Sequence, residues 1–232
     1  MQIKIPLSRV LTILIGFPAI SYLLSLLLLR REWFDSLGLD FFTLFWMLIG
    51  LWYLIQIGIT IRVLKASHLD LSAIGYRFNF QRTAWLITGY LILAFALFGF
   101  IEFALASANV TEEEINSLSD LSNITPKTTT NRIIFIVVGL VAGISEEFVY
   151  RGFAIQSLEG YNINKWIAVI ISAIPFVFQH GLKSIDQFWW FFIWGLVLGI
   201  IFILTKRKLY INIIIHWLII LSGMLAILQL ID

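Results

Sequence analysis

Long apolar runs that carry almost no charged residues constrain this chain more than any other feature. A helix needs about 20 apolar residues to cross the hydrocarbon core of a bilayer, and several runs here reach that length. Barrel strands would alternate apolar and polar residues, whereas these runs are continuous. Because 60% of the residues are hydrophobic and only 13% are charged, the polar surface is too small for a water-soluble globule. The sequence therefore predicts an all-α, polytopic membrane bundle of about seven transmembrane helices.

The predicted spans follow one another through short links, apart from one long polar stretch over 107–131. That stretch contains Glu112-Glu113-Glu114, followed by Ser, Thr and Asn residues, and is typical of an exposed loop. The first span ends before Arg30-Arg31 without a small-residue cleavage site, so we expect a retained helix and not a signal peptide. Short links between the last four spans favour one compact antiparallel bundle. The expected spans are 7–29, 41–64, 84–106, 132–157, 165–180, 187–204 and 209–230.

Positive charge is concentrated at one end of the predicted bundle. If the spans alternate in direction, ten Lys and Arg residues lie on the side of the N-terminus and five on the other side. Cytoplasmic loops are enriched in Lys and Arg, so we expect a cytoplasmic N-terminus. A net charge of +2 gives no indication of a nucleic-acid partner. The absence of cysteine excludes disulfides, thiolate metal ligands and a cysteine nucleophile.

One apolar span contains three ionisable residues, in the segment GISEEFVYRGF at 143–153. A charged side chain near the membrane centre costs about 2.5–3.5 kcal/mol, and such residues usually pair inside the bundle and mark a functional site. Glu147 and Arg151 stand at i and i+4, where helical side chains meet. Glu146 is rotated by about 100° from Glu147 on an α-helix and need not share that arginine. The competing interpretation is a buried salt bridge that only fixes helix packing.

Two histidines in later spans extend this group of residues. His180 ends the fifth expected span, and His216 lies within the seventh, one turn after Asn212. A glutamate can act as general base on a water molecule while one histidine holds the water and another stabilises an oxyanion. Two histidines and a carboxylate are also a catalytic zinc ligand set. No HExxH segment is present, and the sequence leaves both forms of hydrolysis open.

These residues resemble the CAAX protease and bacteriocin-processing (CPBP, or Abi) family of intramembrane glutamic endopeptidases, which includes the type II CAAX prenyl endopeptidase. EEFVYRG resembles its EExxxR motif, and FVFQH resembles its FxxxH motif at Phe176 and His180. His216 occupies the histidine position of a third motif, but Ile220 stands where the family has Asn or Asp. The resemblance covers roughly 132–222. We therefore divide one membrane domain into variable N-terminal helices with a polar loop (1–131) and a four-helix catalytic region (132–232).

The resemblance implies an intramembrane endopeptidase that hydrolyses a membrane-associated peptide or a lipidated, CAAX-like protein with a glutamate-activated water. It implies a prokaryotic cell membrane as the location, no required cofactor, and zinc as an alternative, because the family has also been described as metalloproteases. The oligomeric state stays open. The implied site residues are Glu146 and His180 on the water, Glu147 and Arg151 in support, and His216 in the oxyanion hole.

Ile220 weakens the expectation of full activity, because the loss of one oxyanion-hole donor costs about 10²–10³-fold in rate. Asn212 could replace the missing amide from the other side of His216. The alternative function is a catalytically weak membrane scaffold or bacteriocin-immunity protein. A proton-coupled transporter is a third hypothesis, without a visible inverted repeat to support it.

Two GxxxG segments also occur, at Gly139 and Gly143 and at Gly195 and Gly199. Small residues at this spacing allow helices to approach closely. We expect them to pack helices within this bundle.

Overall fold

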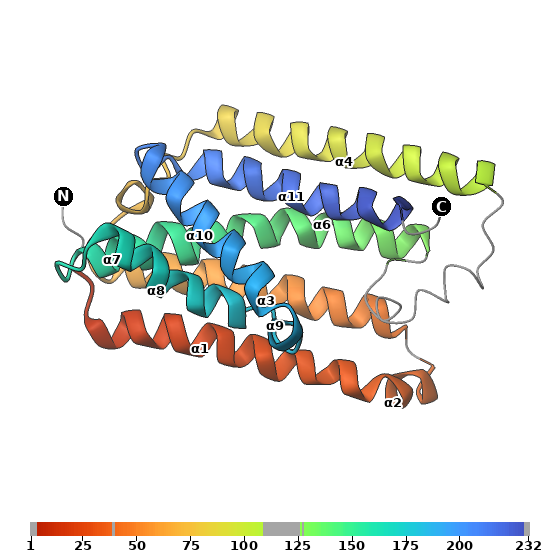
Figure 1. Cartoon of the computed structure of the whole chain (residues 1–232), viewed down its shortest axis with the longest axis horizontal. Helices are drawn as coiled ribbons and strands as arrows, with labels where there is room; N and C mark the ends of the chain where they lie inside the picture. The colour runs from red at the N-terminus through yellow and green to blue at the C-terminus, as the bar shows by residue number, and fades with distance from the viewer. Residues whose placement is uncertain (1–3, 39, 109–125, 127, 230–232) are drawn as a thin grey trace.

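All regular secondary structure in the described part of the chain is helical, as the sequence predicts. The structure is a computed structural model that describes residues 4–38, 40–108, 126 and 128–229. Most of the helices run along one common axis (Figure 1). In chain order they are α1 (Leu7–Ser25), η1 (Leu26–Arg30), α2 (Arg31–Ser36), α3 (Phe41–Lys65), η2 (Leu71–Ile74), α4 (Phe80–Ala108), α6 (Thr129–Glu146), η3 (Glu147–Ile155), α7 (Gln156–Glu159), α8 (Lys165–Phe178), α9 (Lys183–Asp186), α10 (Phe188–Leu204) and α11 (Leu209–Gln229).

Four helical stretches are long and apolar enough to cross a membrane, and three shorter apolar helices accompany them. The long stretches are Leu7–Phe34, Phe41–Lys65, Phe80–Phe100 and Thr129–Glu159. Together with the apolar composition, they support an integral membrane protein. Seven crossings are not established by these helices.

The first helical stretch continues past the expected end at Arg30-Arg31. It turns into the short helix η1 and then α2, which ends at Ser36. Arginine side chains near a helix end can extend to the membrane surface, so they do not have to terminate the helix. The polar loop expected over 107–131 lies for the most part outside the described residues, and its two ends belong to α4 and α6.

Helices α8 and α10 form a short antiparallel hairpin. They contain 14 and 17 residues, which gives lengths of about 21 and 26 Å at 1.5 Å per residue. Both are shorter than the hydrocarbon core of about 30 Å. The turn between them, which includes α9, lies about midway along the bundle (Figure 1). Side chains in this turn are therefore close in depth to the centre of the molecule.

Glycines allow close contact at two helix pairs, as the two GxxxG segments predict. A Cβ at Gly199 of α10 would lie 2.6 Å from a methyl carbon of Val169 in α8. A Cβ at Gly143 of α6 would lie 2.5 Å from the indole of Trp217 in α11. The Trp217 indole nitrogen donates to the Leu140 carbonyl at 3.1 Å. Helix α11 is thereby held against α6 directly beside His216.

The segment that carries the charged motif is a π-helix, η3, where the sequence predicts a continuous α-helix. All nine of its residues are buried, and it contacts α3, α6, α8, α10 and α11. The Ser172 hydroxyl of α8 donates to the Tyr150 carbonyl of η3 at 2.7 Å. π-helical segments within α-helices occur frequently at functional sites.

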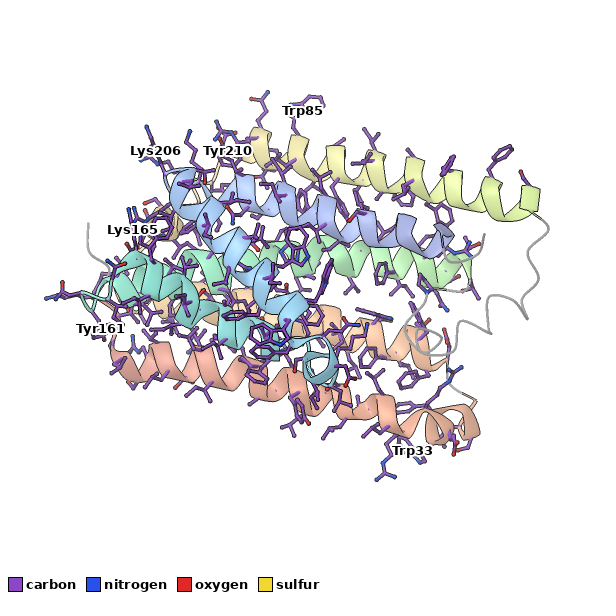
Figure 2. The ribbon with its side chains drawn as sticks, in the orientation of Figure 1. Trp33, Trp85, Tyr161, Lys165, Lys206 and Tyr210 are labelled. Carbon is purple, nitrogen blue, oxygen red and sulfur yellow. The ribbon has the colours of Figure 1, made fainter. Side chains whose placement is uncertain are left out.

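The two ends of the bundle carry aromatic side chains that are exposed. Trp33 lies near one end, and Tyr161 lies at the other end together with Lys165 and Lys206 (Figure 2). Trp and Tyr are enriched at both membrane–water interfaces. The long axis of the bundle is therefore consistent with the membrane normal.

Candidate active site

Glu147 is held by three side chains from two helices. Its Oε1 lies 3.2 Å from the Arg151 guanidinium and accepts a hydrogen bond from His216 Nδ1 at 2.8 Å. Its Oε2 accepts from Asn212 Nδ2 at 3.1 Å. The carboxylate is fully buried, so these partners compensate for the loss of water. The expected i,i+4 contact between Glu147 and Arg151 is present even though η3 is a π-helix.

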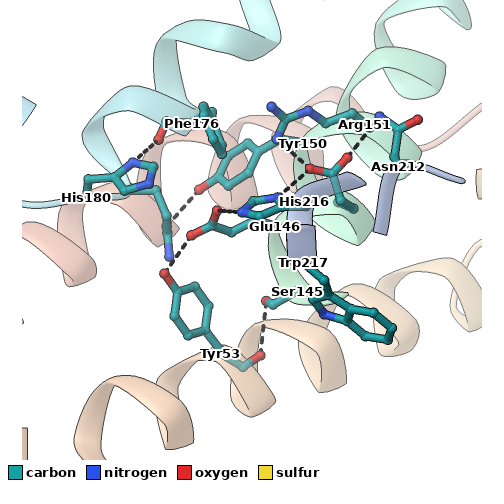
Figure 3. Close-up of polar contacts among 12 residues, drawn as sticks. Tyr53, Ser145, Glu146, Tyr150, Arg151, Phe176, His180, Asn212, His216 and Trp217 are labelled. Atoms are coloured by element: carbon teal, nitrogen blue, oxygen red, sulfur yellow. Dashed lines mark hydrogen bonds and ion pairs between the residues drawn. The ribbon is translucent and has the colours of Figure 1, made fainter. Parts of the chain in front are cut away.

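Glu146 has fewer and different partners. The Tyr53 hydroxyl of α3 donates to its Oε1 at 2.6 Å, and His216 Nε2 lies 3.4 Å from its Oε2 (Figure 3). Because His216 Nδ1 donates to Glu147, Nε2 carries no hydrogen when the ring is neutral. A hydrogen bond between Nε2 and Glu146 therefore requires one proton on either group. His216 connects the two glutamates.

Phe176, the aromatic residue of the FxxxH segment, lies at the centre of the group. Its ring faces the Arg151 guanidinium at 4.0 Å, which is a cation–π contact. The same ring contacts His180 edge-on at 5.0 Å and His216 at 6.4 Å between centroids. Arg151 is buried, and none of its nitrogens makes a hydrogen bond to the described side chains. Phe176 and Glu147 are thus the neighbours that compensate its charge.

His180 is fixed in one orientation by its own turn. Its Nδ1 donates to the Phe176 carbonyl at 2.9 Å, which leaves the lone pair of Nε2 available. The imidazole stacks on Phe191 of α10 with a centroid distance of 3.7 Å. His180 and Glu146 share one side of the close-up (Figure 3), but among the described residues no direct hydrogen bond joins them.

The structure brings all five expected site residues into one cluster. Asn212 does not take the place of the polar side chain that the family has at position 220. Its Nδ2 instead donates to Glu147 and to the Leu198 carbonyl. Ile220 lies beside Gly139 of α6, where a Cβ would be 3.0 Å from its methyl carbon. The position that differs from the family is occupied by a packing contact.

Three polar residues of the cluster were not expected from the sequence. The Tyr150 hydroxyl donates to Gln179 Oε1 at 2.7 Å, and the Gln179 side chain also interacts with the Tyr53 hydroxyl. These contacts connect Tyr150, Gln179, Tyr53 and Glu146 in series. Tyr150 lies within EEFVYRG and Gln179 within FVFQH, so their positions in these motifs could have indicated that they belong to the site. Tyr53 lies in an aromatic-rich helix with no motif, and nothing in the sequence distinguishes it.

The described side chains of the cluster are not arranged as a zinc-binding site. Within the described residues, no three His, Asp or Glu side chains are arranged to hold a metal ion. Glu146 Oε1 is bonded to Tyr53, and His216 Nδ1 is bonded to Glu147. Three-ligand zinc coordination would require these side chains to rearrange.

Comparison with known families agrees with this geometry. Residues 128–221 match the family model described as Type II CAAX prenyl endopeptidase Rce1-like. This segment, the Rce1-like region, covers about two-fifths of the chain. The Rce1-like region contains all five expected site residues, whereas Tyr53 lies outside it. No curated protein and no solved structure matches the chain. Similarity to the Rce1-like family over this region supports a membrane protease of the CAAX type.

Proposed function

We propose that the chain is an intramembrane endopeptidase that uses Glu146 to activate water. The observation that carries this proposal is the contrast between the two buried glutamates. Glu147 forms an ion pair with a guanidinium and accepts hydrogen bonds from an imidazole and an amide, whereas Glu146 contacts one hydroxyl and the more distant edge of His216. A carboxylate with an oxygen that is not fully hydrogen-bonded is the better general base.

The proposed reaction begins with a water between Glu146 and His180. Glu146 Oε2 removes one proton from the water, and the Nε2 lone pair of His180 accepts the hydrogen bond of the other. The water oxygen attacks the substrate carbonyl, and a tetrahedral oxyanion forms. Collapse of this intermediate breaks the C–N bond as the leaving nitrogen receives a proton.

His216 is suited to handle the transferred proton. Its Nε2 lies 3.4 Å from Glu146 Oε2, and its Nδ1–H is held by the Glu147 carboxylate. A carboxylate on Nδ1 stabilises an imidazolium, as in catalytic triads. We infer that the proton passes from Glu146 through His216 to the leaving nitrogen. The oxyanion role that the family resemblance implies for His216 stays a prediction.

The hairpin of α8 and α10 supports access of water to this site. Non-helical backbone at membrane depth is tolerated where it is buried in protein or lines a water-filled cavity. The turn at mid-length contains Gln179, His180 and Lys183, and Asp186 at its end is exposed. A polar turn at this depth would allow water to approach His180 from the side of α9.

We further propose the class of substrate and the membrane topology. The substrate is a membrane-associated peptide or a lipidated, CAAX-like protein, and the enzyme resides in the cell membrane of a prokaryote. The chain crosses the membrane with a cytoplasmic N-terminus, in line with the ten-to-five distribution of Lys and Arg. In the seven-helix arrangement, α8 and α10 are the two short members.

The second candidate function is a catalytically weak scaffold or immunity protein. Ile220 supports it, because its side chain packs at Gly139 and provides no polar group. In that case the cluster around Glu147 would serve to fix the bundle, and substrate would bind without turnover.

Cleavage of a fluorogenic farnesylated CAAX peptide by the purified full chain distinguishes these functions. Glu146→Gln keeps the size of the side chain but removes the base, so we expect a loss of about 10²–10⁴-fold in kcat. Glu32→Gln, at an exposed glutamate in α2, is the matched control and should leave turnover unchanged. Equal turnover by wild type and Glu146→Gln would contradict the protease proposal. Binding of the peptide without cleavage by wild type would support the scaffold.

Zinc is tested with the same preparation. We expect full turnover after treatment with a chelator and no stoichiometric zinc by elemental analysis. Loss of turnover that added zinc restores would show that the side chains rearrange around a metal.

A further inference from the structure

A strongly basic cavity lies at the end of the bundle opposite Trp33, well separated from α9 and the centre of the site. Its volume is about 510 Å³. It is enclosed by the link after η2, the start of α4, and the turn between α10 and α11. The five cationic residues that line it are Arg77, Arg82, Lys206, Arg207 and Lys208.

The backbone around this cavity is fixed by specific contacts. The Gly75 carbonyl accepts a hydrogen bond from the Leu209 amide at 3.1 Å. Gly75 has φ +83° and no room for a Cβ, which would meet the Arg207 carbonyl. Lys206 and Arg207 both adopt left-handed backbone conformations, with φ 56° and 58°. The turn that carries the cations is therefore held against the η2 link and is not a loose segment.

The positive charge in the cavity is mostly uncompensated. Arg207 pairs with Glu159 at 2.7 Å, and the Arg82 guanidinium lies over the Tyr210 ring at 5.3 Å. Arg77, Lys206 and Lys208 are exposed, and within the described residues no carboxylate forms an ion pair with them. Three cations that converge on one cavity without acidic partners favour an anionic ligand.

The surroundings of the cavity are those of a membrane interface. Phe78, Phe80 and Trp85 stand next to it in the chain and are 62%, 78% and 67% exposed. Tyr210 and Lys206, which line the cavity, lie towards the end of the bundle opposite Trp33 (Figure 2). Large exposed aromatic side chains around a basic cavity match a ligand that has both an anionic head and an apolar body.

We propose that this cavity binds the phosphate-bearing headgroup of an anionic phospholipid. Lys206 and Lys208 from the α10–α11 turn and Arg77 from the opposite wall contact the phosphate. The acyl chains leave the cavity along the apolar surface of α4, beside Trp85. Basic pockets between transmembrane helices are a recognised form of binding site for anionic lipid headgroups. The site is independent of the proposed hydrolysis at Glu146.

Native mass spectrometry of the full chain in neutral detergent tests this site. Phosphatidylglycerol, phosphatidylcholine with the same acyl chains, and inorganic phosphate are titrated separately. We expect phosphatidylglycerol to bind at least tenfold more tightly than either of the others. Equal affinity for the two lipids would overturn the proposal, and so would inorganic phosphate that binds as tightly as phosphatidylglycerol, since the site would then take a soluble anion.

Charge variants locate the binding to the cavity. Lys206→Gln combined with Lys208→Gln should weaken phosphatidylglycerol binding by roughly thirtyfold, at about 1 kcal/mol for each cation. Lys4→Gln combined with Lys165→Gln removes two exposed cations that do not line the cavity and should leave the affinity unchanged. Lys206→Arg with Lys208→Arg keeps the charge and should retain binding, which separates loss of charge from misfolding. Equal loss in both glutamine pairs would overturn the assignment to this cavity.

Discussion

At the scale of single residues, the adjacent Glu146 and Glu147 contact side chains from different helices. Glu147 draws its partners from η3 and α11, and these partners use both of its oxygens. Glu146 draws its shortest hydrogen bond from Tyr53 in α3. Both oxygens of Glu147 thereby have close partners, whereas Glu146 Oε2 has only the more distant His216 Nε2 among the described contacts. The proposed division between a supporting and a reacting glutamate depends on this difference.

Replacement of Tyr53 by Phe tests the hydrogen bond to Glu146. The ring stays in place, but Glu146 Oε1 loses its donor at 2.6 Å and can rotate away from the reactive position. We expect kcat on the farnesylated peptide to fall by about 10-fold or more, with KM unchanged, because the bond orients the base and does not bind substrate. Tyr90→Phe is the matched control, since its buried hydroxyl donates to the Ile136 carbonyl. An equal effect of both variants would indicate a packing role alone.

Replacement of Asn212 by Leu tests the support of Glu147. Leu fills a similar volume but removes the hydrogen bonds that Asn212 Nδ2 donates to Glu147 Oε2 and to the Leu198 carbonyl. Leaving a buried acceptor unpaired costs about 1–3 kcal/mol, and more when it is charged. We expect a lower melting temperature in detergent and a smaller loss of turnover than Glu146→Gln produces. An unchanged melting temperature would show that the amide does not hold Glu147.

The sequence indicated the members of this cluster unevenly. Ionisable residues are conspicuous in an apolar chain, so Glu146, Glu147 and Arg151 were recognisable. The i,i+4 spacing of Glu147 and Arg151 predicted the observed ion pair. Tyr53 was not recognisable, because one hydroxyl in an aromatic-rich helix carries no charge penalty to mark it. Which helix faces Glu146 is decided by the packing of α3 along α6, and no residue pattern specifies that contact.

At the scale of helices, close packing of α6 against α11 positions His216. Trp217 follows His216 directly, and its indole fills the space that Gly143 leaves open. The GxxxG spacing predicted a close contact but not its partner. Apart from the first stretch, which continues past Arg30-Arg31, the bounds of the apolar helices were predictable within a few residues, since charge and turn residues end them. The π-helical form of η3 was not, because it depends on burial of all nine residues by several helices.

Gly143→Ala tests this contact. The added methyl group would lie 2.5 Å from the Trp217 ring, so the indole has to move and the neighbouring His216 with it. Overpacking of this kind costs about 1–3 kcal/mol, and we expect a lower melting temperature together with reduced turnover. Gly58→Ala in α3, where a Cβ meets nothing within 4 Å, should preserve both quantities and stabilise the helix slightly. Equal behaviour of the two variants would contradict the proposed role of the contact.

At the scale of the whole molecule, the charges and the short hairpin of α8 and α10 make a joint prediction about topology. The end that carries Lys206 holds most of the cations, and Trp33 marks the opposite end (Figure 2). The turn after α8 lies midway between them (Figure 1). If the cation-rich end faces the cytoplasm, Trp33 lies on the outer side of the membrane and Lys206 on the cytoplasmic side. The end of α9 then lies at an intermediate depth.

Single cysteines can test this topology without background, since the chain has none of its own. We expect Trp33→Cys to react with a membrane-impermeant maleimide in intact cells, because the side chain is 59% exposed at the proposed outer end. Lys206→Cys should react only after permeabilisation, because cytoplasmic loops collect the cations. Asp186→Cys, at the end of α9, should react from outside but more slowly than Trp33→Cys, since the reagent has to reach mid-depth. Labelling of Lys206→Cys alone in intact cells would reverse the orientation. Equal rates for Asp186→Cys and Trp33→Cys would mean that α8 and α10 cross the whole bilayer, and water would then need another route to His180.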